Sequence, residues 1–311
     1  MGAIRILPGC PRWAPALQRE IRRERRGLPQ PRTAGPNTPL SYPLTALISD
    51  LHGNRPALEV VLADAAARGV ERIVCLGDVV GYGGSPVWCL ERVIELCSEG
   101  AADKTGKPLI PGFCLLGNHE QALLVSAEDF NPRARAAIEW TRGAVDGGTD
   151  GRGAEAAGLW NFLGELEPCQ RDEAAMFVHG SPRDPVREYV LPSDIRRPDK
   201  MQSLFEHTDR PVCFLGHSHV AAVYYEDQRF FRPNGTEGPF QIGASMKNRC
   251  LINVGSVGQP RDSDPRCGYA LFDGVHVTFV RLEYDVSAAQ ADIRAIPALP
   301  SSLAERLAVG R

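Results

Sequence analysis

Eight side chains with nitrogen or oxygen donors stand directly after apolar runs of the chain. They are Asp50, His52, Asp78, Asn118, His119, His179, His217 and His219, and they include five of the seven histidines. Donors of this kind without thiolate suit Mn, Fe, Zn, Ni or Co rather than a cysteine-rich zinc site. Eight groups exceed the needs of one tetrahedral ion, so we expect two divalent cations about 3.5–4 Å apart. Asp78 is the candidate bridge, because each of its carboxylate oxygens can bind one cation.

The apolar runs that precede these side chains have the length of buried strands. The runs are 44–49, 73–77, 113–117, 174–178, 212–216 and 251–254. Because ligands of an open α/β sheet bind beyond the carboxyl ends of its strands, we expect the strand ends to bring the donors together. Residues i and i+2 of an extended segment project to one side, so Asp50 with His52, and His217 with His219, are expected to share a face. His207 and His276 lie outside this pattern and are assigned structural roles.

Helical patterns alternate with the strands, which indicates a layered α/β domain. The predicted helices are 55–68, 86–99, 132–145, 154–166 and 199–207, with a short one at 301–309. Asp273–Gly274 between two apolar runs predicts a hairpin of 269–272 with 275–282, and this hairpin is expected to form an antiparallel sheet edge. The division expected is a flexible leader over 1–43 and one domain over 44–311, with a helical insert at about 120–170 and a short C-terminal helix.

Composition and charge exclude several classes of protein. Hydrophobic residues make up 43% and charged residues 23%, the balance of an ordered globular protein. No apolar run has the length of a membrane span. Residues 1–43 carry +6, from eight Arg and two Glu, which leaves −9 on the rest of a chain whose formal net charge is −3. An acidic body argues against a nucleic-acid groove, and only the leader offers such a contact. Nine cysteines without a C-x-x-C spacing favour the reducing cytoplasm.

Five short motifs in a fixed order resemble the calcineurin-like metallophosphoesterase superfamily. They are D-x-H at 50–52, G-D at 77–78, G-N-H-E at 117–120, H-G at 179–180 and G-H-S-H at 216–219. The resemblance spans residues 44 to about 282. The stretches 77–83 and 253–258 are similar to the small bacterial and archaeal phosphodiesterase-like branch. Protein phosphatases and diadenosine tetraphosphate hydrolases carry an Arg shortly after G-D, where this chain has Gly81 and Tyr82.

The resemblance implies a four-layer α/β/β/α sandwich with a binuclear metal site. One metal is expected on Asp50, His52, Asp78 and His219, and the other on Asp78, Asn118, His179 and His217. His119 is expected to face the substrate instead of binding metal. The implied activity is hydrolysis of small phosphate esters, with phosphodiesters and manganese favoured. The alternatives are a protein Ser/Thr-type phosphomonoesterase, a dinucleoside polyphosphate hydrolase, or a scaffold of the same fold without catalysis.

A mechanism follows from this set of residues. A water shared by two dications loses its proton near neutral pH and attacks phosphorus in line, while the cations offset the charge of the transition state. His119 is the expected general acid for the leaving oxygen. Arg55, Arg183 and Arg261 follow the strand ends and are the candidates for binding the substrate phosphate.

Overall fold

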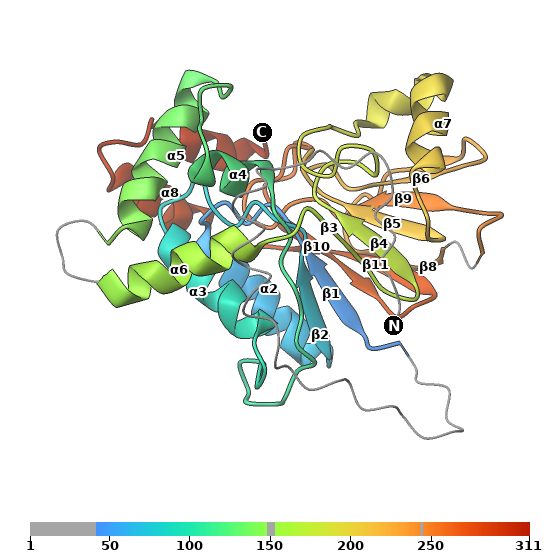
Figure 1. The fold of residues 1–311 in the computed structure, drawn as a ribbon, viewed down its shortest axis with the longest axis horizontal. Helices are drawn as coiled ribbons and strands as arrows, with labels where there is room; N and C mark the ends of the chain where they lie inside the picture. Colours follow the sequence, from blue (N-terminus) through green and yellow to red (C-terminus); the bar gives the residue numbers. More distant parts are fainter. Residues whose placement is uncertain (1–41, 148–152, 243–244) are drawn as a thin grey trace, which may run out of the picture. The chain divides into compact units, whose positions relative to one another are not determined.

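The computed structural model of the protein describes residues 42–147, 153–242 and 245–311. The predicted leader therefore lies, except for residues 42 and 43, outside the described residues, and the domain division stays a prediction. The structure describes two β-sheets, which face each other, with helices on their outer faces (Figure 1). This arrangement confirms the expected α/β/β/α sandwich.

The first sheet has the strand order β2-β1-β10-β11-β8. Its strands are β1 (Thr45–Ile48), β2 (Arg72–Cys75), β8 (Glu237–Gln241), β10 (Cys267–Phe272) and β11 (His276–Leu282). β1 runs parallel to β2 and antiparallel to β10. The predicted hairpin is present as β10 and β11, but its placement at the sheet edge was wrong. β8 pairs with the outer side of β11 and forms that edge.

The second sheet has the order β3-β4-β5-β9-β6-β7. Its strands are β3 (Cys169–Arg171), β4 (Ala175–Val178), β5 (Val212–Leu215), β6 (Ala222–Tyr225), β7 (Phe230–Phe231) and β9 (Cys250–Asn253). β4, β5 and β9 are parallel neighbours. Large apolar side chains of both sheets, such as Leu47, Phe177, Phe214 and Phe272, are buried between them. Each such side chain stabilises the fold by about 1.5–3 kcal/mol.

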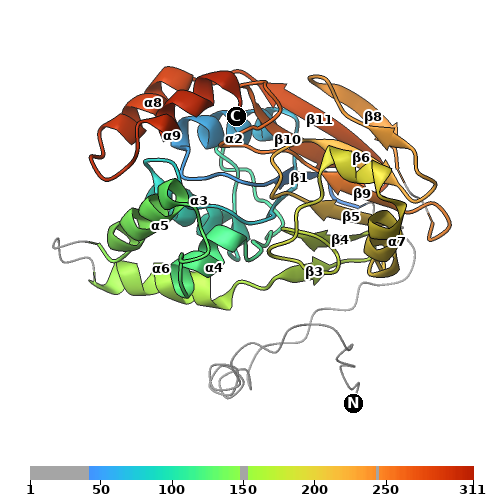
Figure 2. The same cartoon turned by 90° about the horizontal axis from the view of Figure 1, so that it is seen from above.

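Helices cover the outer face of each sheet (Figure 2). The helices described are α2 (Arg55–Ala67), α3 (Pro86–Cys97), α4 (Asn118–Leu124), α5 (Pro132–Val145), α6 (Gly153–Glu165), α7 (Pro198–Glu206), α8 (Val286–Arg294) and α9 (Ser302–Glu305), with 3-10 turns η1 (Pro192–Arg196) and η2 (Arg306–Val309). α2 and α3 pack on the first sheet and α7 on the second. None of the helices within the described ranges is long and apolar enough to cross a bilayer.

Local signals explain where these helices begin. The side chain of Asn54 accepts a hydrogen bond from the Ala57 backbone N–H at 3.2 Å, and Pro56 stands in the first turn of α2. Asn131 caps α5 in the same way. The predicted strand at 113–117 differs, because Cys114 and Leu115 form only isolated bridges, to Cys75 and Glu167. That segment lies between β2 of the first sheet and the residues that precede β3.

Candidate metal centre

Loops at one end of the two sheets carry the predicted metal-binding side chains. Asp50 and His52 follow β1, Asp78 follows β2, His179 follows β4, and His217 and His219 follow β5, while Asn118 begins α4. The two aspartates and four of the histidines are almost completely buried. They form two groups whose donor atoms lie within 4.8 Å of one another: Asp50, His52, Asp78 and His219 in one, and Asp78, His179 and His217 in the other. Asp78 belongs to both groups.

The backbone turns sharply at five of these residues. Asp50, His52, Asp78, His217 and His219 have φ values of 54°, 47°, 54°, 63° and 59°. This left-handed region is unfavourable for residues other than glycine, and such strain concentrates at functional sites. Asp50 with His52, and His217 with His219, therefore point inward because the backbone turns at both residues of each pair. The extended backbone that the sequence analysis expected there was wrong.

Short distances join the donor atoms at the centre of the cluster. His52 Nε2 lies 3.2 Å from His219 Nε2, and His179 Nε2 lies 3.1 Å from His217 Nδ1. Asp78 Oδ2 lies between the pairs, 3.7 Å from His52 Nε2 and 3.4 Å from His179 Nε2. Asn118 Oδ1 is 3.0 Å from His179 Nε2. Ring nitrogens of different histidines thus face one another at the spacing of ligands around a shared cation.

The outward nitrogen of each of these four rings faces a backbone carbonyl. His52 Nδ1 donates to Val80 O, His179 Nδ1 to Leu76 O, His217 Nε2 to Arg187 O and His219 Nδ1 to Gln259 O, at 2.9, 3.0, 3.1 and 2.5 Å. Because a carbonyl oxygen can only accept, the outward nitrogen must carry the proton. A neutral ring then directs the lone pair of its other nitrogen into the cluster, as metal-binding histidines do.

Each aspartate uses one oxygen for the backbone and directs the other inward. Asp50 Oδ2 accepts from the His217 N–H at 3.0 Å, and Asp78 Oδ1 accepts from the His119 N–H at 2.9 Å. Asp50 Oδ1 is buried and has no hydrogen-bond donor among the described residues. An unpaired buried carboxylate oxygen is unfavourable. Inward lone pairs and a carboxylate oxygen without a donor fit divalent cations.

Burial and mutual charge set the protonation of the metal-free cluster. Burial would raise the pKa of Asp78, but the surrounding histidines lower it well below its usual value. Burial lowers the pKa of His217 to about 3 and holds that of His52 well below its usual range. Burial also opposes charge on His179, but Asp78 outweighs it and raises the pKa of His179 to about 9. One proton, on His179, therefore balances part of the negative charge near neutral pH.

His119 lies beside this cluster without joining it. Its Nε2 is 4.0 Å from Asp78 Oδ2, and its Nδ1 is buried without a partner among the described residues. Burial lowers the pKa of His119 to about 4. Gly81 leaves room for the ring, because a Cβ at that position would lie 2.1 Å from His119 Nδ1.

Glu120 holds the loop that presents Asp78. Its buried carboxylate accepts hydrogen bonds from the backbone N–H groups of Asp78 at 2.8 Å, Gly117 at 3.0 Å and Val80 at 3.1 Å. Burial and the charge of Asp78 raise the pKa of Glu120 to about 7 despite these bonds. Glu120 therefore links the second and third motifs, in addition to capping α4 through the Gly117 N–H.

The three arginines predicted to bind phosphate have different surroundings. Arg55 pairs with Glu59 at 2.8 Å and lies over the Trp88 ring, and Arg183 pairs with Glu188. Both guanidinium groups therefore already have acidic partners. Arg261 is at the cluster, since its backbone N–H donates to His219 O at 3.2 Å and its charge acts on His119.

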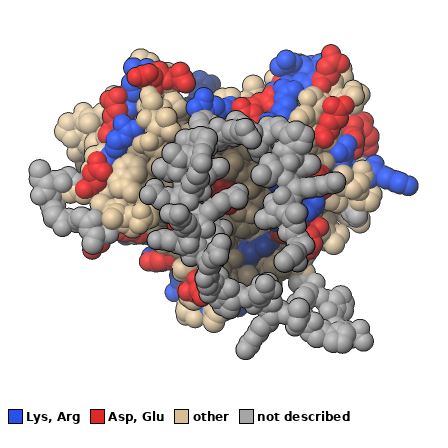
Figure 3. Space-filling model, viewed as in Figure 1, with Lys and Arg blue, Asp and Glu red and all other residues tan. Residues whose placement is uncertain are grey.

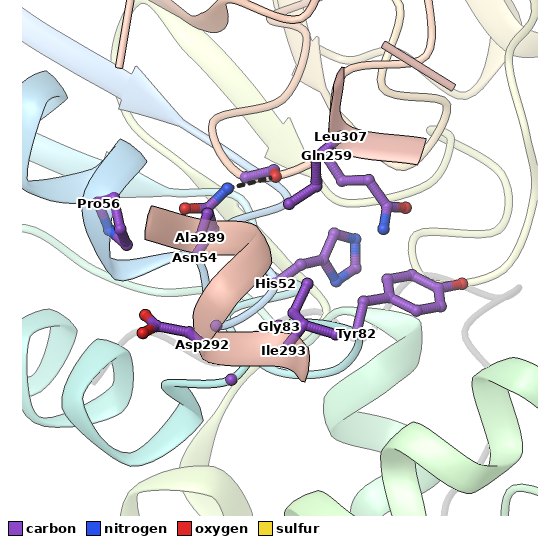
Figure 4. Close-up of a pocket in the computed structure, with 13 residues that line it drawn as sticks. His52, Asn54, Pro56, Tyr82, Gly83, Gln259, Ala289, Asp292, Ile293 and Leu307 are labelled. Carbon is purple, nitrogen blue, oxygen red and sulfur yellow. Dashed lines mark hydrogen bonds between the residues drawn. The ribbon is translucent and has the colours of Figure 1, made fainter. Parts of the chain in front are cut away.

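The structure adds three aromatic side chains to the site. Tyr189 stacks on His217 with ring centroids 3.7 Å apart, and Phe130 meets the His119 ring edge to face. Tyr82 lies beside His52, with its hydroxyl directed away from that ring (Figure 4). All three line a cleft of about 240 Å³ that reaches Asn118 and His217. No motif identifies Phe130 or Tyr189 in the sequence, because each is brought to the site by the path of a loop.

Comparisons with known proteins agree with this geometry. The family model of the calcineurin-like phosphoesterase superfamily domain matches residues 44–275. An uncharacterised protein of Methanocaldococcus jannaschii is 32% identical over 274 residues, which cover 86% of this chain and 98% of that protein. A solved metallophosphoesterase from Sphaerobacter thermophilus is 36% identical, with a TM-score of 0.69, and the match covers 87% of this chain and 100% of the other. A hypothetical protein of Pyrococcus horikoshii OT3, 18% identical with a TM-score of 0.64, shares the fold over 86% of this chain and 98% of its own.

Proposed function

Because the chain belongs to the calcineurin-like phosphoesterase superfamily, we propose that it hydrolyses small phosphate esters, preferentially diesters, with two divalent cations. The observation that carries this proposal is the convergence of four inward-facing histidine nitrogens and two buried carboxylates. One cation would be held by Asp50, His52, Asp78 and His219, and the other by Asp78, Asn118, His179 and His217. Manganese is the favoured ion among those that suit nitrogen and oxygen donors.

The chemistry divides between the cations and the side chains around them. When bound, the two cations supply Lewis-acid catalysis, which favours attack of water on a phosphate ester. His119 faces the same space and, in its charged form, gives its Nε2 proton to the leaving oxygen. Because burial lowers its pKa to about 4, this role requires the negative charge of the bound phosphate to favour the charged form. Arg261 binds a nonbridging oxygen of the substrate phosphate through its guanidinium group. Asp78, whose loop is held by Glu120, would belong to both sets of metal-binding residues.

The surroundings of His119 favour a diester over a protein substrate. No carboxylate of the described residues pairs with its outward nitrogen. Protein phosphatases of this superfamily have, shortly after the G-D motif, an acidic residue that pairs with this histidine. This chain has Gly81 and Tyr82 at those positions. On the described part of the face in Figure 3, basic and acidic side chains lie side by side, which suits a small substrate better than a nucleic-acid backbone.

We also place the enzyme in the cytoplasm, in keeping with its cysteine content.

The test compares two chromogenic esters on the metal-depleted protein after addition of Mn²⁺, Ni²⁺ or Co²⁺. We expect faster hydrolysis of bis-nitrophenyl phosphate than of nitrophenyl phosphate, and loss of both activities in EDTA. Preference for the monoester would support a phosphomonoesterase instead. Absence of both activities with every metal would support the scaffold.

A matched variant checks the bridging carboxylate. Asp78→Asn keeps the size of the side chain and tolerates the left-handed backbone, but it removes the negative charge. We expect it to lose metal binding and turnover together. Full turnover in this variant would contradict the assignment.

A further inference from the structure

A second hollow adjoins the cleft of the metal site. It has a volume of about 590 Å³ and lies between the start of α5 and the C-terminal segment. Arg133 of α5, Arg306 of η2 and Arg311 line it together with Tyr82 and Asn131. Its walls are therefore rich in guanidinium groups.

Two arginines approach the same aromatic ring. The guanidinium carbon of Arg261 lies 5.9 Å from the centroid of the Tyr82 ring, and that of Arg306 lies 5.6 Å from it. Arg261 Nη2 donates to Gln259 Oε1 at 3.0 Å, while its Nε is buried with no acceptor among the described residues. Arg306 Nε donates to the main-chain oxygen of Arg311. Donor groups thus remain available on both side chains.

No acidic side chain among the described residues forms an ion pair with Arg133, Arg261 or Arg306. Neighbouring arginines differ, because Arg266 pairs with Asp264 and Arg281 with Asp262. Burial, with the charges of Arg261 and Arg133, lowers the pKa of Arg306. Like charges held close together, with no acidic side chain between them, are unfavourable unless an anion joins them.

The hollow and the cleft lie next to each other. Tyr82 and Asn131 line both of them. One face of the Tyr82 side chain meets the rings of His52 and His119, at centroid distances of 4.7 and 4.6 Å. A molecule whose scissile phosphate lies at the metal site can therefore extend past Tyr82 toward the arginines.

We propose that Arg133 and Arg306, next to Arg261 of the metal site, form a second anion subsite, which binds a phosphate group on the part of the substrate beyond the scissile phosphate. The substrate class is then a phosphate ester that carries a second phosphate. This inference rests on the proposed function and narrows it. The subsite binds and orients the substrate, and the bond cleaved remains the ester at the metal site.

The first experiment measures inhibition of the Mn²⁺-loaded enzyme, with bis-nitrophenyl phosphate as reporter. The inhibitors are alkane-diol bisphosphates of three to six carbons and the corresponding monophosphates. Because a charge-assisted hydrogen bond contributes about 1.5–3 kcal/mol and 1.4 kcal/mol is tenfold, we expect the best bisphosphate to bind about tenfold or more tightly than its monophosphate. A ratio near one for every chain length would overturn the subsite.

Three variants locate the effect. Arg306→Gln and Arg133→Gln should each lower the ratio of bisphosphate affinity to monophosphate affinity several-fold. The double variant should bring this ratio close to one. Arg294→Gln removes the same charge from the exposed side of α8, outside the hollow, and should keep the ratio of the unchanged protein. Loss of the ratio in Arg294→Gln as well, or its persistence in the double variant, would contradict the assignment.

Calorimetry separates this inference from the proposed function. Inorganic phosphate is titrated into the metal-free protein, in which the scissile position lacks its cations. We expect phosphate to bind, Arg306→Gln to weaken this binding and Arg294→Gln to leave it unchanged. This result would support the subsite even if no ester were hydrolysed. If the reporter is hydrolysed but phosphate does not bind in this way and bisphosphates are not preferred, the proposed phosphoesterase activity is supported and the subsite is contradicted.

Discussion

His179 is the one histidine of the cluster whose pKa rises. Burial disfavours its charged form, yet Asp78 raises the pKa to about 9, while burial lowers the pKa values of His217 and His52. At neutral pH a cation must therefore displace the proton of His179 before it can bind that nitrogen.

We expect Mn²⁺ binding between pH 6 and 8 to release about one proton per protein. Below pH 9 the folded protein holds this proton, so apparent affinity should rise with pH, about tenfold per unit, and level off above pH 9. Calorimetry in buffers of different ionisation enthalpy gives the number of protons. Affinity independent of pH over this range would contradict the protonation of His179.

The pKa of His119 shifts in the opposite direction to that of His179, because burial lowers it to about 4. We expect His119→Ala to keep both metals and to slow esters with poor leaving groups most, by about 10²–10⁴-fold. An ester of nitrophenolate, which leaves without a proton, should be slowed less. Equal losses on both kinds of substrate, measured by initial rates, would exclude general-acid catalysis by this residue.

At the scale of elements, the loop after β2 depends on a glycine. Gly81 has φ +88°, and its missing Cβ leaves the space that the His119 ring occupies. Gly69, which follows α2, has a similar φ of +76° but no atom within 4 Å of the Cβ position. Both glycines have a left-handed backbone that a Cβ would strain, and they differ in their neighbours.

This contrast gives a matched pair of variants. Both Gly81→Ala and Gly69→Ala should lower the free energy of unfolding, by about 1–2 kcal/mol from left-handed strain. Only Gly81→Ala should also lower turnover, because it displaces His119. Denaturant melts and initial rates separate the two effects. Similar turnover in both variants would show that the position of His119 does not matter.

The elements also show what the sequence could predict. Strand ends followed by His and Asp were predicted correctly, because buried strands are continuous apolar runs and their ends are short motifs. α5 begins and ends where its pattern predicted, at Pro132 and Val145. The division of the strands between two sheets and the edge position of β8 were not predicted, because pairing across long separations leaves no local signal. The helix α8 was missed although Asp285, which caps it, is a local signal.

At the scale of the whole molecule, the cluster joins the two sheets. Asp50, His52 and Asp78 follow strands of the first sheet, and His179, His217 and His219 follow strands of the second. Cations shared by these residues therefore connect the sheets across the buried apolar layer between them. Arg306 reaches the site from the other end of the chain, and for that reason no motif around Asp78 could reveal it.

Metal removal should lower the melting temperature of the described domain. A ligand present at a thousand times its Kd stabilises the folded state by about 4 kcal/mol. For a domain of this size the shift is on the order of 10 °C. Differential scanning calorimetry with EDTA or with Mn²⁺ measures it, and Asp78→Asn should show almost no shift. An equal shift in Asp78→Asn would place the stabilising ion elsewhere.

The left-handed turns at His52, His217 and His219 have a practical consequence for anyone engineering this protein. Glycine at these positions would relieve about 1–3 kcal/mol of conformational strain each in the absence of ions. Random libraries screened only for survival of heating would therefore enrich inert clones with glycine in place of these histidines. Each round of such evolution needs a turnover assay alongside the thermal challenge.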